Sequence, residues 1–160
     1  MRDVKAHIRT TVAGVGAVGL LFLAGCSNSE DPGPPSNEDV AGLLAEWNDA
    51  LATGDPETVA ALYAPDAVLI PTVSNEIRTG HDAIVAYFTD FLPRRPSAVV
   101  EQSVITALDT DHVIDSGVYR FTLHDGNEVS TVDARYSFVY EKQGDDWLIV
   151  NHHSSAMPED

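Results

Sequence analysis

Positions 129–141 read VSTVDARYSFVYE and positions 147–155 read WLIVNHHSS, and these two stretches decide the fold. Both are rich in β-branched and aromatic residues, and apolar and polar side chains alternate along them. A period of two is typical of a half-buried strand, and the turn-forming pair Gly144-Asp145 lies between the two stretches. We therefore predict two long antiparallel strands joined by a tight turn.

The same pattern extends upstream, where residues 98–108 and 113–123 also have the composition of strands. The connectors Asp109-Thr110-Asp111 and Asp125-Gly126-Asn127 carry the turn formers expected between antiparallel neighbours. Strands of about ten residues are longer than a flat, half-buried sheet usually needs. We therefore predict a strongly curved sheet whose concave face encloses a pocket.

A first helix is predicted to begin near Ser36, because Asp39 stands three residues on as a capping-box partner. Apolar residues then recur at helical spacing, and Thr53-Gly54 ends the helix. The residues of this apolar stripe are Val40, Leu43, Leu44, Trp47 and Leu51.

A second helix is capped by Asp55 and begins at Pro56. Its predicted buried stripe consists of Val59, Leu62 and Tyr63. Short strands follow over residues 67–71 and 76–78, and a third helix over residues 83–92. Helices first and an antiparallel sheet afterwards make an α+β fold around one core.

The N-terminus has the pattern of a secretion signal. Residues 1–9 carry three basic side chains, and residues 10–24 are almost wholly apolar, a run shorter than the roughly 20 residues of a membrane span. The segment ends in Leu23-Ala24-Gly25-Cys26, which resembles the lipobox of bacterial lipoproteins. We expect residues 1–25 to be cleaved and Cys26 to be lipidated, so that the protein is exported and anchored to the cell envelope. A retained anchor helix is the alternative.

Residues 26–36 would then form the lipidated cysteine and a proline-rich tether, and residues 37–158 a single domain. The only expected membrane contact is the N-terminal lipid. A single cysteine excludes an intrachain disulfide. The formal net charge is −16 and the one adjacent basic pair is Arg94-Arg95, so we expect no nucleic-acid partner.

Several stretches resemble the nuclear transport factor 2-like superfamily, also described as SnoaL-like or cystatin-like cone proteins, which includes ketosteroid isomerase. These stretches are residues 53–55, 62–67, 79–84 and 147–158. The resemblance implies three helices packed in the concave face of the curved antiparallel sheet.

The last of these stretches, together with Ala134-Arg135-Tyr136, is similar to bacterial proteins grouped with the association domain of calcium/calmodulin-dependent protein kinase II and with the SgcJ/EcaC branch. In the kinase this domain assembles subunits, so the resemblance implies self-association and no kinase activity. The chain has no glycine-rich loop, no His-Arg-Asp and no Asp-Phe-Gly, which kinases need to position phosphates.

Candidate pocket residues come from the helices and from the inner faces of the strands. They are Trp47, Tyr63, Tyr87, Phe91, Tyr119, Arg135, His152 and His153. The aromatic residues of the predicted helices form a stripe, which is compatible with a solid core and equally with the wall of a cavity. Arg135 is an anion partner if its face is concave, and a surface residue if that face is convex. His152 and His153 are adjacent in a strand and point to opposite faces, so we expect no metal site, and no cofactor either.

Candidates for a general base are Asp66, Asp115, His81 and His153, and candidate proton donors are Tyr63, Tyr87 and Tyr119. Enzymes of the superfamily often run cofactor-free acid–base chemistry with such groups, whose pKa values are tuned by burial. None of these residues lies in a motif tied to a reaction, and each also has an ordinary structural role.

We therefore expect a binding module rather than an enzyme, one that holds a small apolar or amphipathic molecule and forms a homodimer or higher homo-oligomer through the open sheet face. A first alternative is a cofactor-free isomerase, cyclase or dehydratase, whose mark would be a buried Asp or His within reach of a tyrosine. A second is a purely structural self-association domain, which an exposed patch of Tyr136, Phe138 and Tyr140 would favour.

Overall fold

The computed structural model describes residues 33–158, so the predicted signal segment, Cys26 and most of the tether lie outside the described residues. The helices are α1 (Asn37–Thr53), α2 (Pro56–Ala60) and α3 (His81–Phe91), the last followed by the 3₁₀ turn η1 (Leu92–Arg94). The strands are β1 (Tyr63–Ile70), β2 (Arg78–Thr79), β3 (Ser97–Ala107), β4 (His112–Asp125), β5 (Glu128–Gln143) and β6 (Asp146–Ala156).

Helix α1 begins and ends where the sequence predicts. The Ser36 hydroxyl accepts the backbone N–H of Asp39 at 3.2 Å, and the Asp39 carboxylate accepts the backbone N–H of Ser36 at 3.1 Å. This reciprocal capping box satisfies two N–H groups that a helix start otherwise leaves free. Gly54 closes the helix in the left-handed conformation, with φ of 72°.

Helix α2 is shorter than predicted, because Leu62 and Tyr63 leave the helix for the sheet. The backbone N–H of Ile149 donates to the Leu62 carbonyl at 2.9 Å, and Tyr63 pairs with Ile149 as the first residue of β1. Pro65 lacks an N–H, and it lies in the stretch between Tyr63 and Val68 where the pairing register shifts. The predicted strand start at residue 67 was therefore four residues too late.

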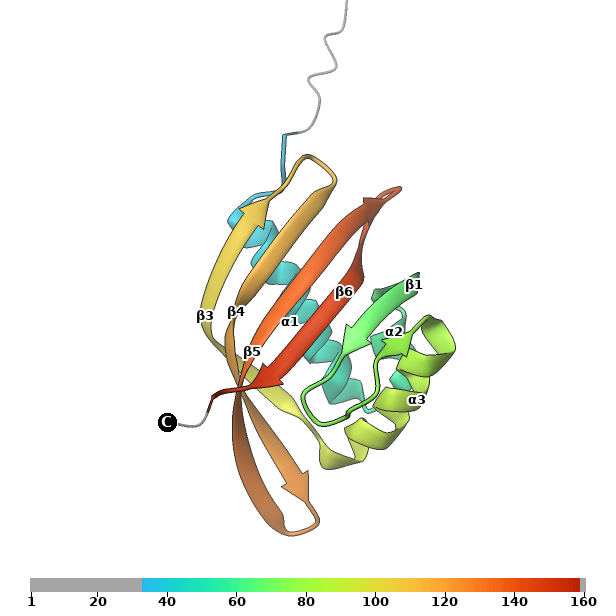
Figure 1. Cartoon of the computed structure of the whole chain (residues 1–160), viewed down its shortest axis with the longest axis vertical. Helices are drawn as coiled ribbons and strands as arrows, with labels where there is room; N and C mark the ends of the chain where they lie inside the picture. Colours follow the sequence, from blue (N-terminus) through green and yellow to red (C-terminus); the bar gives the residue numbers. More distant parts are fainter. Residues whose placement is uncertain (1–32, 159–160) are drawn as a thin grey trace, which may run out of the picture. The chain divides into compact units, whose positions relative to one another are not determined.

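The six strands form one sheet in the order β2-β1-β6-β5-β4-β3 (Figure 1). β3, β4, β5 and β6 are antiparallel neighbours, as predicted. The sheet is nevertheless mixed, because β1 runs parallel to β6, a pair that the prediction of an antiparallel sheet did not include. A parallel pair needs a long connection, and here α3 and the other strands provide it. The α+β fold of three helices and a six-stranded sheet is otherwise confirmed.

The core lies between the helices and one face of the sheet. Every second side chain is buried over residues 119–123 of β4 and 134–140 of β5, as the period-two pattern predicts. Tyr136, Phe138 and Tyr140 are among these buried residues, so they do not form an exposed patch for self-association. Apolar side chains on the opposite face include Val99 and Val104 of β3, which are 63% and 67% exposed.

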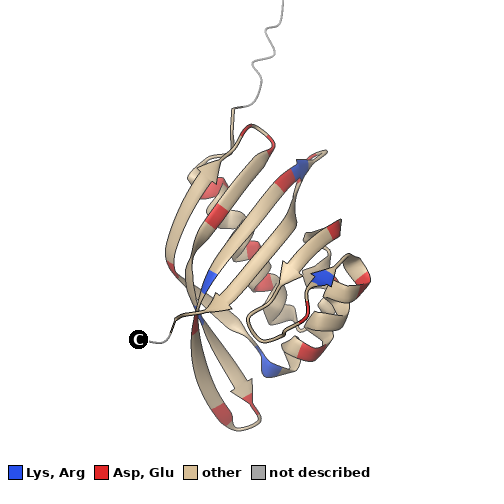
Figure 2. Ribbon diagram, in the orientation of Figure 1, with Lys and Arg blue, Asp and Glu red and all other residues tan. Residues whose placement is uncertain are grey.

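Acidic residues are spread over helices, strands and turns of the described chain, and basic residues are few and scattered (Figure 2). Among residues 33–158, no helix is both long and apolar enough to cross a membrane.

Candidate functional site

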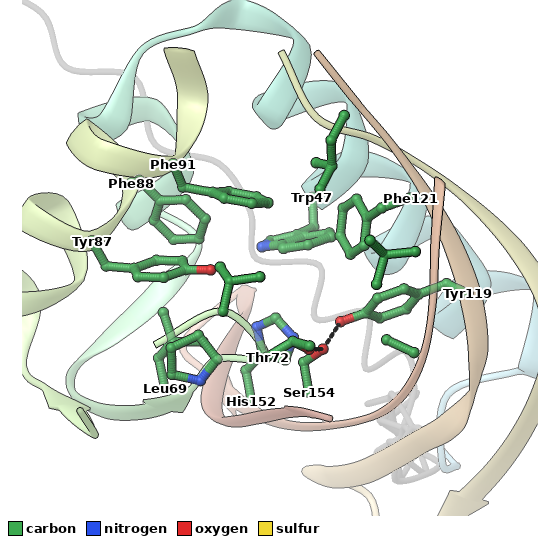
Figure 3. Close-up of a pocket in the computed structure, with 15 residues that line it drawn as sticks. Trp47, Leu69, Thr72, Tyr87, Phe88, Phe91, Tyr119, Phe121, His152 and Ser154 are labelled. Atoms are coloured by element: carbon green, nitrogen blue, oxygen red, sulfur yellow. Dashed lines mark hydrogen bonds between the residues drawn. The ribbon is translucent and has the colours of Figure 1, made fainter. Parts of the chain in front are cut away.

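An inner cavity lies between α1, α3 and the buried face of β4, β5 and β6 (Figure 3). Its aromatic and histidine lining residues are Trp47, Tyr87, Phe88, Phe91, Tyr119, Phe121 and His152, and the others are Leu69, Pro71, Thr72, Val73, Leu123, Val132, Ala134 and Ser154. The space open to the centre of a water molecule is about 30 Å³. A buried water needs at least about 10–15 Å³ by this measure, so the cavity as it stands has room for about two waters.

A second hollow adjoins the inner cavity on its α3 side. It is open to solvent, has about 290 Å³ of such space, and shares Val73, Tyr87 and Phe91 with the inner cavity. The rings of Tyr87 and Phe91 stack at a centroid distance of 5.5 Å and form the wall between the two spaces. A rotation of these two side chains would therefore join the inner cavity to the outer hollow.

The floor of the inner cavity contains a buried hydrogen-bond chain from α1 to β6. The indole N–H of Trp47 donates to the Tyr63 hydroxyl at 3.0 Å, and that hydroxyl lies 2.9 Å from Nδ1 of His152. The Phe138 ring stacks on the imidazole at 3.9 Å. Burial, and to a smaller extent the neighbouring charge of His153, lower the pKa of His152 to about 3, so the imidazole is neutral at physiological pH.

The chain also fixes the tautomer of His152. Indole N–H can only donate, so the Tyr63 oxygen accepts from Trp47, and the single Tyr63 proton is free to go to Nδ1 of His152. The opposite tautomer would leave the Tyr63 proton without an acceptor. The imidazole proton therefore resides on Nε2, a buried atom that has no hydrogen-bond partner among the described residues.

Beside this imidazole lies a second polar group made of three hydroxyls (Figure 3). Tyr119 donates to the Ser154 hydroxyl at 2.5 Å, and the Ser154 hydroxyl in turn shares a short hydrogen bond with Thr72. Burial raises the pKa of Tyr119, so the phenol keeps its proton. The polar floor is thus made of neutral donors, while the walls are apolar.

A separate buried carboxyl lies under the edge of the sheet. Asp115 accepts a hydrogen bond from Ser103 at 2.7 Å, and the Tyr136 hydroxyl approaches its oxygens at 3.3 and 3.4 Å. Burial raises the pKa of Asp115, and the two hydroxyl contacts partly oppose that rise. Asp115 lines another hollow of about 330 Å³, which lies between α1 and β3 and includes Leu44 and Asn48.

Five of the eight predicted pocket residues line the inner cavity, namely Trp47, Tyr87, Phe91, Tyr119 and His152. Tyr63 lies behind His152 as its hydrogen-bond partner. Arg135 and His153 were wrongly placed in the pocket, because both are exposed on the other face of the sheet, where Arg135 contacts the Ala156 carbonyl at 3.5 Å. Alternation along the strands explains why Arg135 and His153 face outward, because the residues before them, Ala134 and His152, point inward.

The candidate bases are not brought together. Asp66 is exposed on β1, and His153 is exposed on β6. His81 is a partly exposed residue that lies 3.0 Å from the Glu57 carboxylate at the surface. Asp115 alone is fully buried. Among the described residues, no three His, Cys, Asp or Glu side chains come close enough to hold a metal ion.

Thr72 and Ser154 are site residues that sequence reasoning missed. Ser154 is two residues beyond His152 in the same strand, so alternation could have placed it on the inner face. Thr72 follows Pro71 in the loop after β1, where no periodicity indicates the direction of a side chain.

Comparison with known proteins finds a family and a fold. The family model of the calcium/calmodulin dependent protein kinase II association domain matches residues 36–158. A crystal structure from Xanthomonas campestris, described as such an association domain, is 54% identical, with a TM-score of 0.77 over 79% of this chain and 91% of that chain. A scytalone dehydratase structure from Novosphingobium aromaticivorans is 15% identical, with a TM-score of 0.68 over 76% of this chain and 83% of that chain, which is a likeness of fold alone.

A shorter similarity joins the chain to an enzyme. The steroid Δ-isomerase of Nocardioides simplex is 40% identical over 50 residues, which are 31% of this chain and 41% of the isomerase. The match thus spans less than half the length of that curated relative.

Proposed function

Since the chain belongs to the calcium/calmodulin dependent protein kinase II association domain family, we propose that it is a lipid-anchored, extracytoplasmic module that binds a small apolar or amphipathic molecule in its inner cavity and works as a homodimer. The observation that carries the binding proposal is the polar floor under apolar walls. A buried polar atom without a partner costs free energy, and Nε2 of His152 is such an atom at the edge of an otherwise apolar space. A bound molecule would remove that cost.

The connection to the outer hollow supports the size of ligand that we propose. About 30 Å³ of space open to water centres is too little for a molecule of more than a few heavy atoms. Rotation of Tyr87 and Phe91 would add part of the 290 Å³ hollow next to them, which has the size of an ordinary small-ligand site. The ligand would then be held between the aromatic side chains of α1 and α3 and the hydroxyls of the sheet.

The test is native mass spectrometry of the intact protein, purified in mild detergent from its own host. We expect a mass above that of the polypeptide by one small molecule per protomer, and we expect that molecule to be lost from the variant Leu69→Trp, which fills the cavity. Leu148→Trp, at a half-buried position outside the cavity lining, is the control and should keep the ligand. Empty protomers under all conditions would contradict the binding proposal.

The same measurement tests the lipid anchor. We expect the polypeptide to begin at Cys26 and to carry the mass of a diacylglycerol group, and Cys26→Ser to abolish both cleavage and lipid. Ser27→Ala is the matched control and should leave both unchanged. An N-terminus at Met1 in the wild type would contradict the proposed export signal.

The homodimer is proposed to form through the outer sheet face, where Val99 and Val104 are mostly exposed. Val104→Arg should shift the native mass to the monomer. Val129→Arg, at an equally exposed valine in the β4–β5 hairpin, should not. A wild-type monomer would contradict the dimer.

A second candidate function, cofactor-free acid–base catalysis, is favoured by one observation. The structure has two buried pairs of a base and a tyrosine, His152 with Tyr63 and Asp115 with Tyr136. A pKa of about 3 makes His152 a poor base at neutral pH, so Asp115 is the better candidate. If the ligand retained from the host is chemically converted by the wild type and not by Asp115→Asn, the catalytic function replaces the binding function.

A further inference from the structure

The floor of the inner cavity presents donor protons that no described residue accepts, beside the neutral oxygens of its hydroxyl groups. The Trp47–Tyr63–His152 chain places the imidazole proton on Nε2, where no described residue accepts it. His152 is only 3% exposed, so solvent at the surface does not satisfy this proton. A buried N–H without an acceptor is uncommon in folded proteins, and it indicates a missing partner.

The neighbouring hydroxyls supply a second donor. Tyr119 gives its proton to Ser154, and a single further hydrogen bond joins Ser154 to Thr72. Each hydroxyl has only one proton. If Thr72 donates to Ser154, the Ser154 proton is unused, and if Ser154 donates to Thr72, the Thr72 proton is unused. His152 and Ser154 are two residues apart on the same face of β6, and both line the inner cavity with Thr72, so the two unused protons belong to groups that face the same space (Figure 3).

The charges around the cavity restrict the ligand further. Neither a carboxylate nor a cationic side chain lines the inner cavity, and His152 is neutral. An ionised group buried here would lose its hydration without gaining a counter-charge, which is unfavourable. A protonated amine has no lone pair, so it could not accept the protons that the cavity offers. The ligand group that best fits this floor is therefore an uncharged oxygen that accepts hydrogen bonds.

We propose that the inner cavity selects a compact ring-containing molecule whose buried end is a neutral ketone or aldehyde carbonyl, held by the Nε2–H of His152 and by one hydroxyl of the Ser154–Thr72 pair. Once Tyr87 and Phe91 rotate to open the outer hollow, the ring would pack against the aromatic walls formed by Trp47, Phe88 and Phe121. This inference rests on the proposed binding function and adds the class of ligand to it.

The experiment uses four probes of similar shape and isothermal titration calorimetry on the intact protein. Acetophenone has a carbonyl, isopropylbenzene has no acceptor, benzoate is an anion, and 1-phenylethylamine is a cationic donor. We expect acetophenone to bind about tenfold more tightly than isopropylbenzene, as one additional buried hydrogen bond implies, and benzoate and the amine to bind more weakly than acetophenone.

Two variants separate the donor from general effects of mutation. His152→Phe keeps a flat ring and removes the donor, so the tenfold preference for acetophenone should disappear. His153→Phe changes the adjacent histidine on the outer face and should keep the preference. If His152→Phe fails to fold, Tyr63→Phe serves in its place. Without the Tyr63 proton the imidazole of His152 is no longer held in one tautomer, so the preference for acetophenone over isopropylbenzene should decrease.

A second readout needs no ligand. Nitrogen-15 NMR of labelled histidine should show His152 as the neutral Nε2–H tautomer at pH 6–8 in the wild type, and a mixture of tautomers in Tyr63→Phe. A dominant Nδ1–H tautomer in the wild type would overturn the inference. So would equal affinities for acetophenone and isopropylbenzene, or tighter binding of benzoate or the amine, although in these cases binding itself would stand. If none of the four probes binds while native mass spectrometry shows a ligand retained from the host, the inference fails and the binding function stands. If the protomers are also empty, both fail.

Discussion

The buried imidazole of His152 makes the stability of the fold depend on pH in a predictable way. Its pKa is about 3 in the folded protein, against 6.5 for an unperturbed histidine. Below pH 6.5 the unfolded chain takes up a proton at this position and the folded chain does not. The contribution of His152 to the free energy of unfolding is therefore largest above pH 6.5, and it decreases as the pH falls from 6.5 towards 3.

The size of the effect follows from the same two values. One pKa unit corresponds to about 1.4 kcal/mol, so at pH 5 the wild type should have lost about 2 kcal/mol that it has above pH 7. Other titrating groups also change the stability over this range, but they are common to the wild type and to a variant of His152 alone. The informative quantity is the difference between the two proteins.

We propose to measure that difference with His152→Asn, whose amide can still accept a hydrogen bond from Tyr63 but does not titrate. The smaller side chain lowers stability at every pH by a constant amount. Urea unfolding followed by circular dichroism at pH 8, 7, 6 and 5 should show the wild type losing about 2 kcal/mol relative to the variant between pH 7 and 5. His153→Asn, at the exposed neighbour, keeps the buried imidazole and should lose stability towards pH 5 much as the wild type does. A difference that stays constant within about 0.5 kcal/mol would refute the reasoning.

Three further predictions concern the frame of the site. Gly117→Ala should lower the free energy of unfolding by about 1–3 kcal/mol in urea titrations, because a Cβ there would overlap the Gln102 carbonyl oxygen and lie 2.9 Å from the Tyr136 hydroxyl; wild-type stability would show that β3 can move aside. Asp115→Asn should unfold at higher urea concentration than the wild type at pH 7 and lose that advantage towards pH 3, because burial raises the pKa of this carboxyl and penalises its ionised form at neutral pH; a destabilised variant at pH 7 would mean that the carboxylate is favourably solvated. Ser36→Ala should lower the thermal midpoint through a loss of about 1 kcal/mol at the start of α1, whereas the control Ser74→Ala, at a half-buried serine whose hydroxyl bonds lie outside any helix, should change it less.

Local signals were enough to predict most of the elements from the sequence. The capping box at Ser36, the glycine at position 54 and the alternation along β4 and β5 are each decided within a few residues of the chain. The same alternation correctly separated His152 from His153. Which of the two faces inward depends on the side of the sheet that the helices cover, and that is a property of the whole fold.

Long-range pairing accounts for what the sequence did not predict. Tyr63 fits the end of an amphipathic helix as well as the start of a strand, and its pairing with Ile149 decides between them. The parallel direction of β1 has the same origin. Thr72 enters the site only because its loop passes Ser154, which is 82 positions away in the chain. Local sequence patterns carry no information about such long-range contacts.

The parallel pairing of β1 with β6 also determines when the cavity can close during synthesis. The bond between Tyr63 and His152 joins residues 89 positions apart, and the last strand lies in the interior of the sheet, between β1 and β5. A nascent chain without residues 146–156 has neither the floor of the cavity nor the link between the two parts of the sheet. Contacts of this range form slowly, so the domain should remain unfolded until β6 has been made. For a protein that we propose to be exported, such a delay would keep the chain unfolded, as passage through a membrane channel requires, until residues 146–156 have been synthesised.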